Sequence, residues 1–199
     1  GEEAEVFAAA SVKLGHAFGF AGKESLEAAA KMAQLKAILG SKEAVIAGTE
    51  MGLAFAAIGE MGTEEAMNRL INLAQQTQFI YGEVGKEAFD MMTAEQQANI
   101  VRSNSIRVLD QLNTVENSSV ATMQQITFTL NQYAAQAHLA GESIGDMAAM
   151  SALLIESGEE ATRAGTGMRM MYQRLANDGT GAAKALMEYI DVTDESEVR

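Results

Sequence analysis

Proline is absent from all 199 residues of the chain. Proline interrupts helices more strongly than any other residue, because its ring clashes with the preceding turn and it lacks a backbone N–H group. Alanine, methionine, glutamate and glutamine, which favour helix, are abundant, and almost no segment alternates with the strand period of two. We therefore predict an all-α fold, with multiple helices in an elongated or bundled array and glycines at the junctions.

Apolar spacing places nine helices along the chain. Their predicted ranges are 3–19, 23–39, 42–59, 63–82, 94–115, 119–140, 143–156, 159–176 and 181–190. Expected N-cap residues are Thr63, Thr93, Ser143 and Ser157, the second and fourth with capping-box partners at Gln96 and Glu160. The glycines expected at the junctions are Gly40, Gly62, Gly141, Gly158 and Gly179.

The chain divides into three expected regions: a glycine- and alanine-rich helical region over 1–92, long helices or a helical hairpin over 93–140, and a further helical region over 141–199. In the middle region, valines recur every seven residues through Val108, and a three-four rhythm continues through Leu130. Two such helices could form an antiparallel hairpin around Asn117 and Ser118 or fuse into one long rod. We expect this heptad-like stretch, with Val108 and Leu130 at its centre, to mediate self-association.

Charge and composition limit the classes of function. The chain has 27 acidic and 14 basic residues, a formal net charge of −13, which opposes binding to nucleic-acid backbones and anionic membranes. It has no cysteine, so disulfides, thiolate metal sites and cysteine nucleophiles are excluded. The longest apolar stretch, 44–59, carries Glu50 and is shorter than the ~20 residues of a spanning helix, so we expect a soluble chain.

No motif in the sequence predicts a catalytic, cofactor-binding or metal site. The stretch "GFAGKES" at 19–25 resembles a phosphate loop but lacks the first glycine and the Ser or Thr after Lys23. His16 and His138 lack partners at metal-ligand spacing. The acid pairs at 64–65 and 159–160 fall in expected first helical turns, where negative charge complements the helix dipole.

Small residues recur at helical spacing in several segments. Gly15 and Gly19 are four apart, and Gly48, Gly52 and Ala56 form a second row. Glycine costs a helix up to ~1 kcal/mol relative to alanine, so such rows favour close approach of a neighbouring helix. Insertion into a membrane at a later stage is the alternative reading of the same rows.

Two glycines also interrupt the stretch "EEATRAGTGMRMMYQRLANDGTGAAKAL" at 159–186. Gly165 and Gly167 lie well inside the expected helix, so their backbone donors are already used and a contact notch is a better interpretation than a phosphate cradle. Arg169 belongs to the polar face of this helix, which either meets solvent or binds a partner's carboxylates. A short final helix is expected beyond it, with Ala182, Leu186, Met187 and Ile190 facing inward.

Residues 141–190 resemble the core region of tail tape measure proteins of tailed bacteriophages. Gly141 with Ser143 matches the start of one helix of that region, and Ala164-Gly165 followed by 169–175 matches its Arg-bearing amphipathic helix. The family often has a proline or a further glycine before its last helix, where "ANDGTGA" supplies only glycines. The rest of the chain is similar only in its helical, methionine- and alanine-rich character.

This resemblance implies a structural virion protein, not an enzyme, that sets tail length inside the tail tube and is expelled during genome ejection. It implies contacts with the tail tube protein, tail terminator, assembly chaperones and baseplate hub, a homo-oligomer, and contact with the host membrane during ejection. The implied location is the tail lumen, and the host cytoplasm during assembly. A single helix of 199 residues would reach only about 300 Å, so the chain is expected to be one portion of a longer tape.

Two other classes of protein fit the same sequence. One is a membrane-active helical protein, such as a toxin or an ejection-channel segment that inserts its glycine-rich helices. The other is a helical accessory domain of an enzyme.

Overall fold

The structure is a computed structural model that describes residues 2–177, and within that range it contains helices and no strand. The prediction of an all-α fold is confirmed. The helices are α1 (Glu2–Ala17), α2 (Gly22–Ala33), α3 (Lys36–Leu39), α4 (Lys42–Ile58), α5 (Thr63–Thr77), the 3-10 helix η1 (Phe79–Val84), α6 (Gly85–Asp90), α7 (Ala94–Asn117), α8 (Met123–Asn131), α9 (Ala134–Leu139), α10 (Ile144–Glu156) and α11 (Ala161–Leu175).

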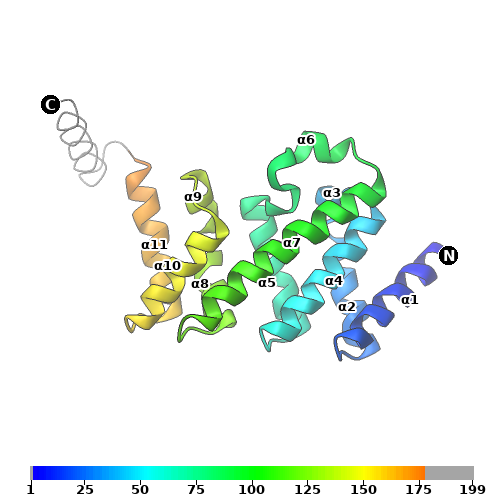
Figure 1. The fold of residues 1–199 in the computed structure, drawn as a ribbon, viewed down its shortest axis with the longest axis horizontal. Coiled ribbons are helices and arrows are strands. Elements are labelled where there is room, and N and C mark those ends of the chain that lie inside the picture. The colour runs from blue at the N-terminus through cyan, green and yellow to red at the C-terminus, as the bar shows by residue number, and fades with distance from the viewer. Residues whose placement is uncertain (1, 178–199) are drawn as a thin grey trace.

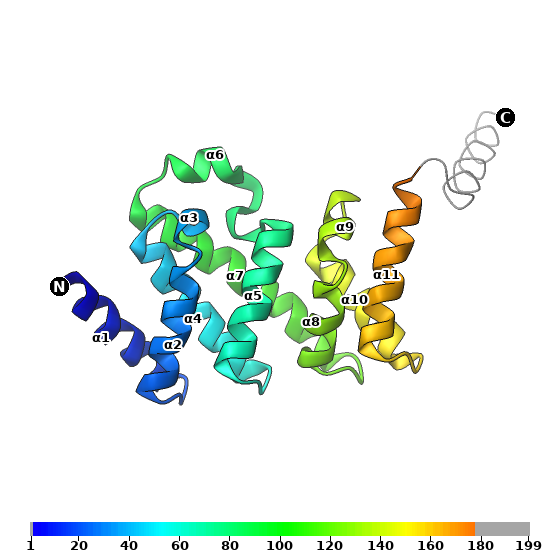
Figure 2. The ribbon, with the colours of Figure 1, turned by 180° about the vertical axis from the view of Figure 1, so that it is seen from behind.

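The helices stack side by side along one long axis, roughly in the order of the sequence (Figures 1 and 2). The pair α1 and α2 forms one end of the array, and α10 and α11 form the other. The longest helix, α7, crosses the middle, where it packs against α4 toward one end and against α8 and α10 toward the other. Of the two predicted arrangements, elongated or bundled, the array is elongated.

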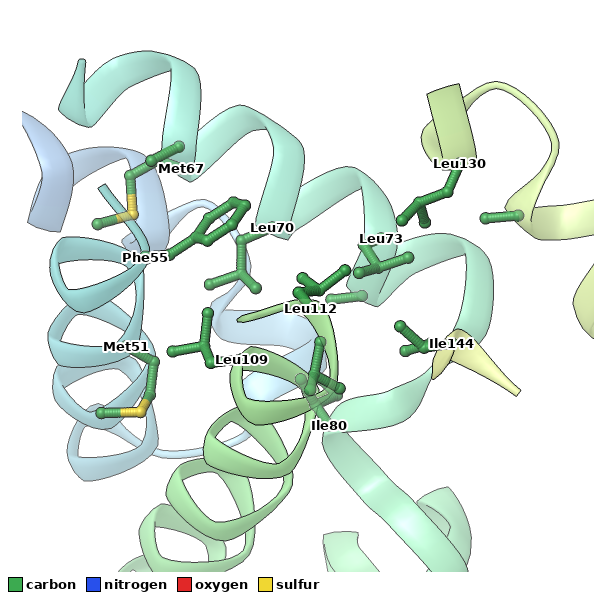
Figure 3. Packing of buried hydrophobic residues seen from close by; sticks show 14 of the residues in the cluster. Met51, Phe55, Met67, Leu70, Leu73, Ile80, Leu109, Leu112, Leu130 and Ile144 are labelled. Carbon is green, nitrogen blue, oxygen red and sulfur yellow. The ribbon is translucent and has the colours of Figure 1, made fainter. Parts of the chain in front are cut away.

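One apolar core runs through the array. Figure 3 shows its centre, where Phe55 of α4, Leu70 of α5, and Leu109 and Leu112 of α7 lie close to one another. The connected buried cluster extends from Ala28 in α2 to Tyr172 in α11, so side chains from all three expected regions share it. Burial of this apolar surface is the main force that holds the stacked helices together.

Close helix approach explains the small-residue rows of the first region. A methyl group on Gly52 would overlap the Met67 side chain of α5, and one on Gly15 would overlap Ser25 of α2. A methyl group on Gly48 would lie 3.0 Å from the Met32 sulfur. Gly19, in contrast, has a φ of +84° in the turn after α1, a backbone conformation that favours glycine. Helix packing therefore accounts for three of these glycines, and a turn accounts for the fourth.

Several predicted boundaries were wrong. The predicted helix 63–82 ends at Thr77, since Gln78 adopts a left-handed conformation with a φ of 53°. The predicted helix 23–39 is divided into α2 and α3. Ser157 ends α10 and does not cap α11, and Gly62 rather than Thr63 occupies the N-cap position of α5. The predicted helix 181–190 lies outside the described residues.

In the middle region, α7 and α8 are separate helices and do not form one continuous rod. α7 ends at Asn117, and Thr122 starts α8 by a capping box in which its hydroxyl accepts from the Gln125 N–H and the Gln125 side chain accepts from the Thr122 N–H. The first helix in the predicted range 119–140 therefore begins at Met123, four residues after the predicted start. This range is also divided at Tyr133 into α8 and α9. Capping by Thr93 with Gln96, and by Ser143, is confirmed.

A polar contact joins α5 to α8. The Arg69 guanidinium donates to the Gln124 carbonyl and to the Thr127 hydroxyl at 2.9 Å, and it pairs with Glu65. Its carbon Cζ lies 5.6 Å from the centre of the Phe128 ring. Arg69 therefore links α5 to α8.

Candidate interaction surface

Gly165 of α11 lies directly against α8. An added Cβ at Gly165 would lie 2.8 Å from the Thr129 carbonyl oxygen, and equally close to the Gln132 side chain. Beside it, the Thr129 hydroxyl donates to the Ala161 carbonyl at 3.1 Å, and the Thr166 hydroxyl bonds the Gln132 side-chain oxygen at 3.2 Å. The close contact expected for this stretch is therefore present at Gly165.

Gly167 does not share that contact. It is exposed, and a Cβ added there would meet no heavy atom within 4 Å. Two residues along an α-helix turn the side-chain direction by about 200°, so Gly167 points away from the helix that Gly165 contacts. The expectation that both glycines form one notch is wrong for Gly167. Arg169 is likewise exposed on α11.

Val108 and Leu130 lie inside the single chain. Val108 is 4% exposed and Leu130 is fully buried, and both belong to the continuous core. The seam that was expected to meet other chains is instead covered by α4, α5, α10 and α11, since these helices pack against α7 and α8. These two residues therefore offer no surface to another copy while the array is folded.

Two stacked tyrosines connect α8 and α9 to the end of the array. The rings of Tyr133 and Tyr172 lie 6.0 Å apart at an interplanar angle of 10°. The Tyr133 hydroxyl donates to the Met147 carbonyl at 2.5 Å and lies 3.0 Å from the Ser151 hydroxyl. Burial raises the pKa of Tyr133 well above its usual range, and burial, aided by the nearby Glu142 carboxylate, raises the pKa of Tyr172 to about 12.

A groove lies beside Tyr172, between α9 and the C-terminal end of α11. Its volume is about 600 Å³, and its walls include Leu139, Ala140, Glu142, Tyr172, Leu175 and Asn177. Leu139 is 87% exposed. We call this hollow the α9/α11 groove. Leu139, Tyr172 and Leu175 make part of the lining of this groove apolar.

Two smaller hollows adjoin each other where η1 meets the start of α10. They have volumes of about 310 and 240 Å³ and share Phe79, Gly82 and Ile144 as lining residues. Polar side chains, among them His138 in one and Arg107 in the other, complete their walls. Glu142 lines both the larger of these hollows and the α9/α11 groove.

Lys23 and Glu64, from two of the excluded motifs, form ion pairs. Lys23 of the "GFAGKES" stretch forms an exposed pair with Glu27 at 3.7 Å, just after the turn that begins α2. Glu64 bonds Lys31 at 2.7 Å, and this hydrogen bond lowers the pKa of the Glu64 carboxyl. Across residues 2–177, no three His, Asp or Glu side chains are grouped so that they could hold a metal ion.

Membrane-spanning potential is limited to one bent pair. Within residues 2–177, no single helix has the length and apolar character to cross a membrane. α4 and α5 have sufficient length and apolar character only when taken together, and the chain bends by 119° at the turn between them. In the folded array most of α4 is covered by neighbouring helices.

Sequence reasoning missed the α9/α11 groove. Leu139 lies within a segment that was predicted to be one helix, and the bend at Tyr133 is what separates α9 from α8 and opens the groove. Leu139 follows the exposed His138 directly and falls outside the three-four apolar rhythm, which was the available signal. Arg69 was also missed, because a single arginine on a helix carries no pattern.

The fold places the chain in the class of all-α proteins built from stacked helices. The chain belongs to the family of phage-related minor tail proteins, whose family model matches residues 8–197. It is therefore a phage tail protein with a structural role, and a component of the virion. Comparisons with curated proteins and with solved structures gave no match.

Proposed function

We propose that this chain is a segment of a tail tape measure protein, which sets tail length inside the tail tube and leaves the tube during genome ejection. The observation that carries the proposal is the match of a phage tail family to almost the whole chain. The resemblance of residues 141–190 to the tape measure core supports the finer assignment. The helices α10 and α11 lie within that stretch.

The physical character of the chain supports the same role. An elongated array of helices in sequence order can contribute length in proportion to residue number (Figure 1). The net charge of −13 disfavours adhesion to DNA, which carries the same sign and follows the same path out of the tube. Tail tube protein, tail terminator, chaperones and baseplate hub are the partners that this role requires.

Tail length in the phage that encodes the chain tests the proposal. In-frame deletion of residues 2–77 or of residues 2–177 should shorten the tail in proportion, by up to about 110 and 260 Å if each residue spans ~1.5 Å. In-frame duplication of the same ranges should lengthen it. Electron microscopy of purified particles measures both. Tails of unchanged length in deletion and duplication alike would contradict a ruler function.

A membrane-active role is the alternative, and the bent pair α4 and α5 is the observation that favours it. In such a role, these helices would leave the core and insert together. Dye-filled liposomes distinguish the two functions. Leakage at neutral or acidic pH would favour insertion, and intact liposomes at both would count against it.

A further inference from the structure

A side chain from α5 bonds both sides of the break between α8 and α9. In a continuous α-helix, the Ala135 N–H group would donate to the Asn131 carbonyl, four residues back. Here the Gln76 amide nitrogen Nε2 donates to the Asn131 carbonyl at 3.1 Å, and its oxygen Oε1 accepts from the Ala135 N–H at 3.2 Å. Two bonds to another helix therefore replace one bond of the helical ladder.

The local sequence at the break favours a continuous helix. Residues 123–139 contain no glycine and no proline, and two alanines, the best helix formers, follow Tyr133 directly. In helices without these residues, a sharp kink commonly arises where a side chain enters the hydrogen-bond ladder. The insertion of Gln76 is a cause of this kind.

The open break also leaves polar groups uncompensated. Asn131 Oδ1 and Gln132 Nε2 are both buried, and neither has a hydrogen-bond partner among residues 2–177. Buried polar atoms without partners cost free energy and are uncommon in folded proteins. The break therefore carries a cost of its own, which the two Gln76 bonds help to offset while α5 is in place.

α8 and α9 do not depend on α5 alone for their position. Both also pack against α10 and α11, and the Tyr133 hydroxyl bonds the Met147 carbonyl of α10. Separation of α5 would therefore remove the Gln76 bonds and leave α8 and α9 their contacts with α10 and α11. The Asn131 carbonyl and the Ala135 N–H would then be free to bond each other.

We propose that residues 123–139 form a two-state joint. While α5 packs against it, Gln76 holds the joint open as α8 and α9. When that interface opens, the Ala135 N–H donates to the Asn131 carbonyl and the joint closes into one continuous helix. A closed joint offers Gln76 neither group, so α5 docks again only after the joint reopens.

Native-state hydrogen exchange of the parent chain in sub-denaturing urea tests for the closed state. In the array the Ala135 N–H bonds a side chain of α5, so without closure it exchanges whenever α5 opens. With closure, the Ala135 amide should exchange at least about tenfold more slowly than the Ala74 and Thr77 amides, which flank Gln76 in α5. Equal exchange of the three amides, after correction for their intrinsic rates, would overturn the proposal.

The substitution Gln76→Ala gives a second, independent test, because it removes both bonds without changing the joint. The carbon-13 chemical shifts of residues 131–134 should move toward those of a continuous helix. The Ala135 amide should stay protected from exchange, since the Asn131 carbonyl becomes its acceptor. Gln75→Ala is the matched control, because Gln75 is the same residue type on the same helix and is exposed. Its shifts at 131–134 should equal those of the parent chain.

The opposite result is equally distinct. If the joint stays open in Gln76→Ala, the shifts at 131–134 will not move and the Ala135 amide will exchange at least about tenfold faster than in the parent, which would refute the proposal. If this variant does not fold, the exchange series on the parent chain decides alone. Neither measurement depends on tail length, so the joint and the proposed tape measure function can fail separately.

Discussion

Gly165 and Gly167 share one helix but not one environment. Gly165→Ala places a methyl group 2.8 Å from the Thr129 carbonyl, and overpacking of this kind costs about 1–3 kcal/mol of unfolding free energy. Gly167→Ala is the matched control, because its methyl group meets open space and raises helix propensity by up to ~1 kcal/mol. Urea unfolding followed by circular dichroism should show a loss for the first variant only. Equal effects would show that α8 does not approach α11 closely.

Tyr133 should make stability depend on alkaline pH. Tyrosine in an unfolded chain loses its proton near pH 10, while burial raises the pKa of Tyr133 in the folded state. The unfolded state therefore releases the proton first, so stability is complete below pH 10 and falls as pH rises above it. Tyr133→Phe should lose about 1 kcal/mol at pH 7 through its missing hydrogen bonds but decline less steeply above pH 10.

The parent chain is the control for this pH series, because lysine deprotonation is common to both proteins. Urea midpoints at pH 7, 9, 10 and 11 provide the comparison. A variant that declines as steeply as the parent would mean that Tyr133 is accessible to solvent in the folded state.

At the scale of the helices, Arg69 connects elements that are far apart in sequence. Its side chain is only 14% exposed and its guanidinium bonds two groups of α8, so Arg69→Ala should cost about 1.5–3 kcal/mol. Arg163→Ala is the matched control. The Arg163 side chain is 76% exposed, and its ion pair with Glu159 is long, at 3.7 Å. Its effect should stay within about 0.5 kcal/mol. Chemical unfolding that shows equal losses would disprove the bridge.

Helix boundaries were predictable from the sequence where a signal within a few residues determines them. The capping residues Thr93 and Ser143 and the apolar rhythm of α7 act within a few residues, so they are readable directly. The bend at Tyr133 was not, because the Tyr133 side chain bonds a distant helix, and the left-handed Gln78 carried no turn signal in the sequence. Tyr133 bonds α10 through Met147, fourteen residues later.

The same distinction holds for the candidate surface. The sequence pointed to a close contact at Gly165 from its unusual place inside a helix, but it could not separate Gly165 from Gly167. Their difference depends on which side of α11 meets α8. The sequence marked Leu139 as lying outside the apolar rhythm, but it could not show the α9/α11 groove, since two helices from separate segments form the groove walls.

For the molecule as a whole, Val108 and Leu130 report on self-association. Both are buried within one chain, so Val108→Asp and Leu130→Asp should each lower the unfolding free energy by at least about 3 kcal/mol, through an unpaired buried charge. Val120→Asp is the control, because Val120 is 79% exposed. In sedimentation velocity, the folded fraction of each core variant should have the same oligomeric state as the parent chain. A folded variant that changes from oligomer to monomer would restore the seam as an interface between chains.

The order of the helices also determines how the molecule responds to force. α1 and α11 lie at opposite ends, so a pull on both ends loads the interfaces between successive helices in series (Figure 1). Under a series load the weakest interface opens first while the others stay packed, and the chain lengthens in steps. α7 packs against both α4 and α10, so α4 and α10 can move apart only when α7 is released from one of them. Mechanical extension of this fold is therefore graded, and a narrow passage could draw it out one helix at a time.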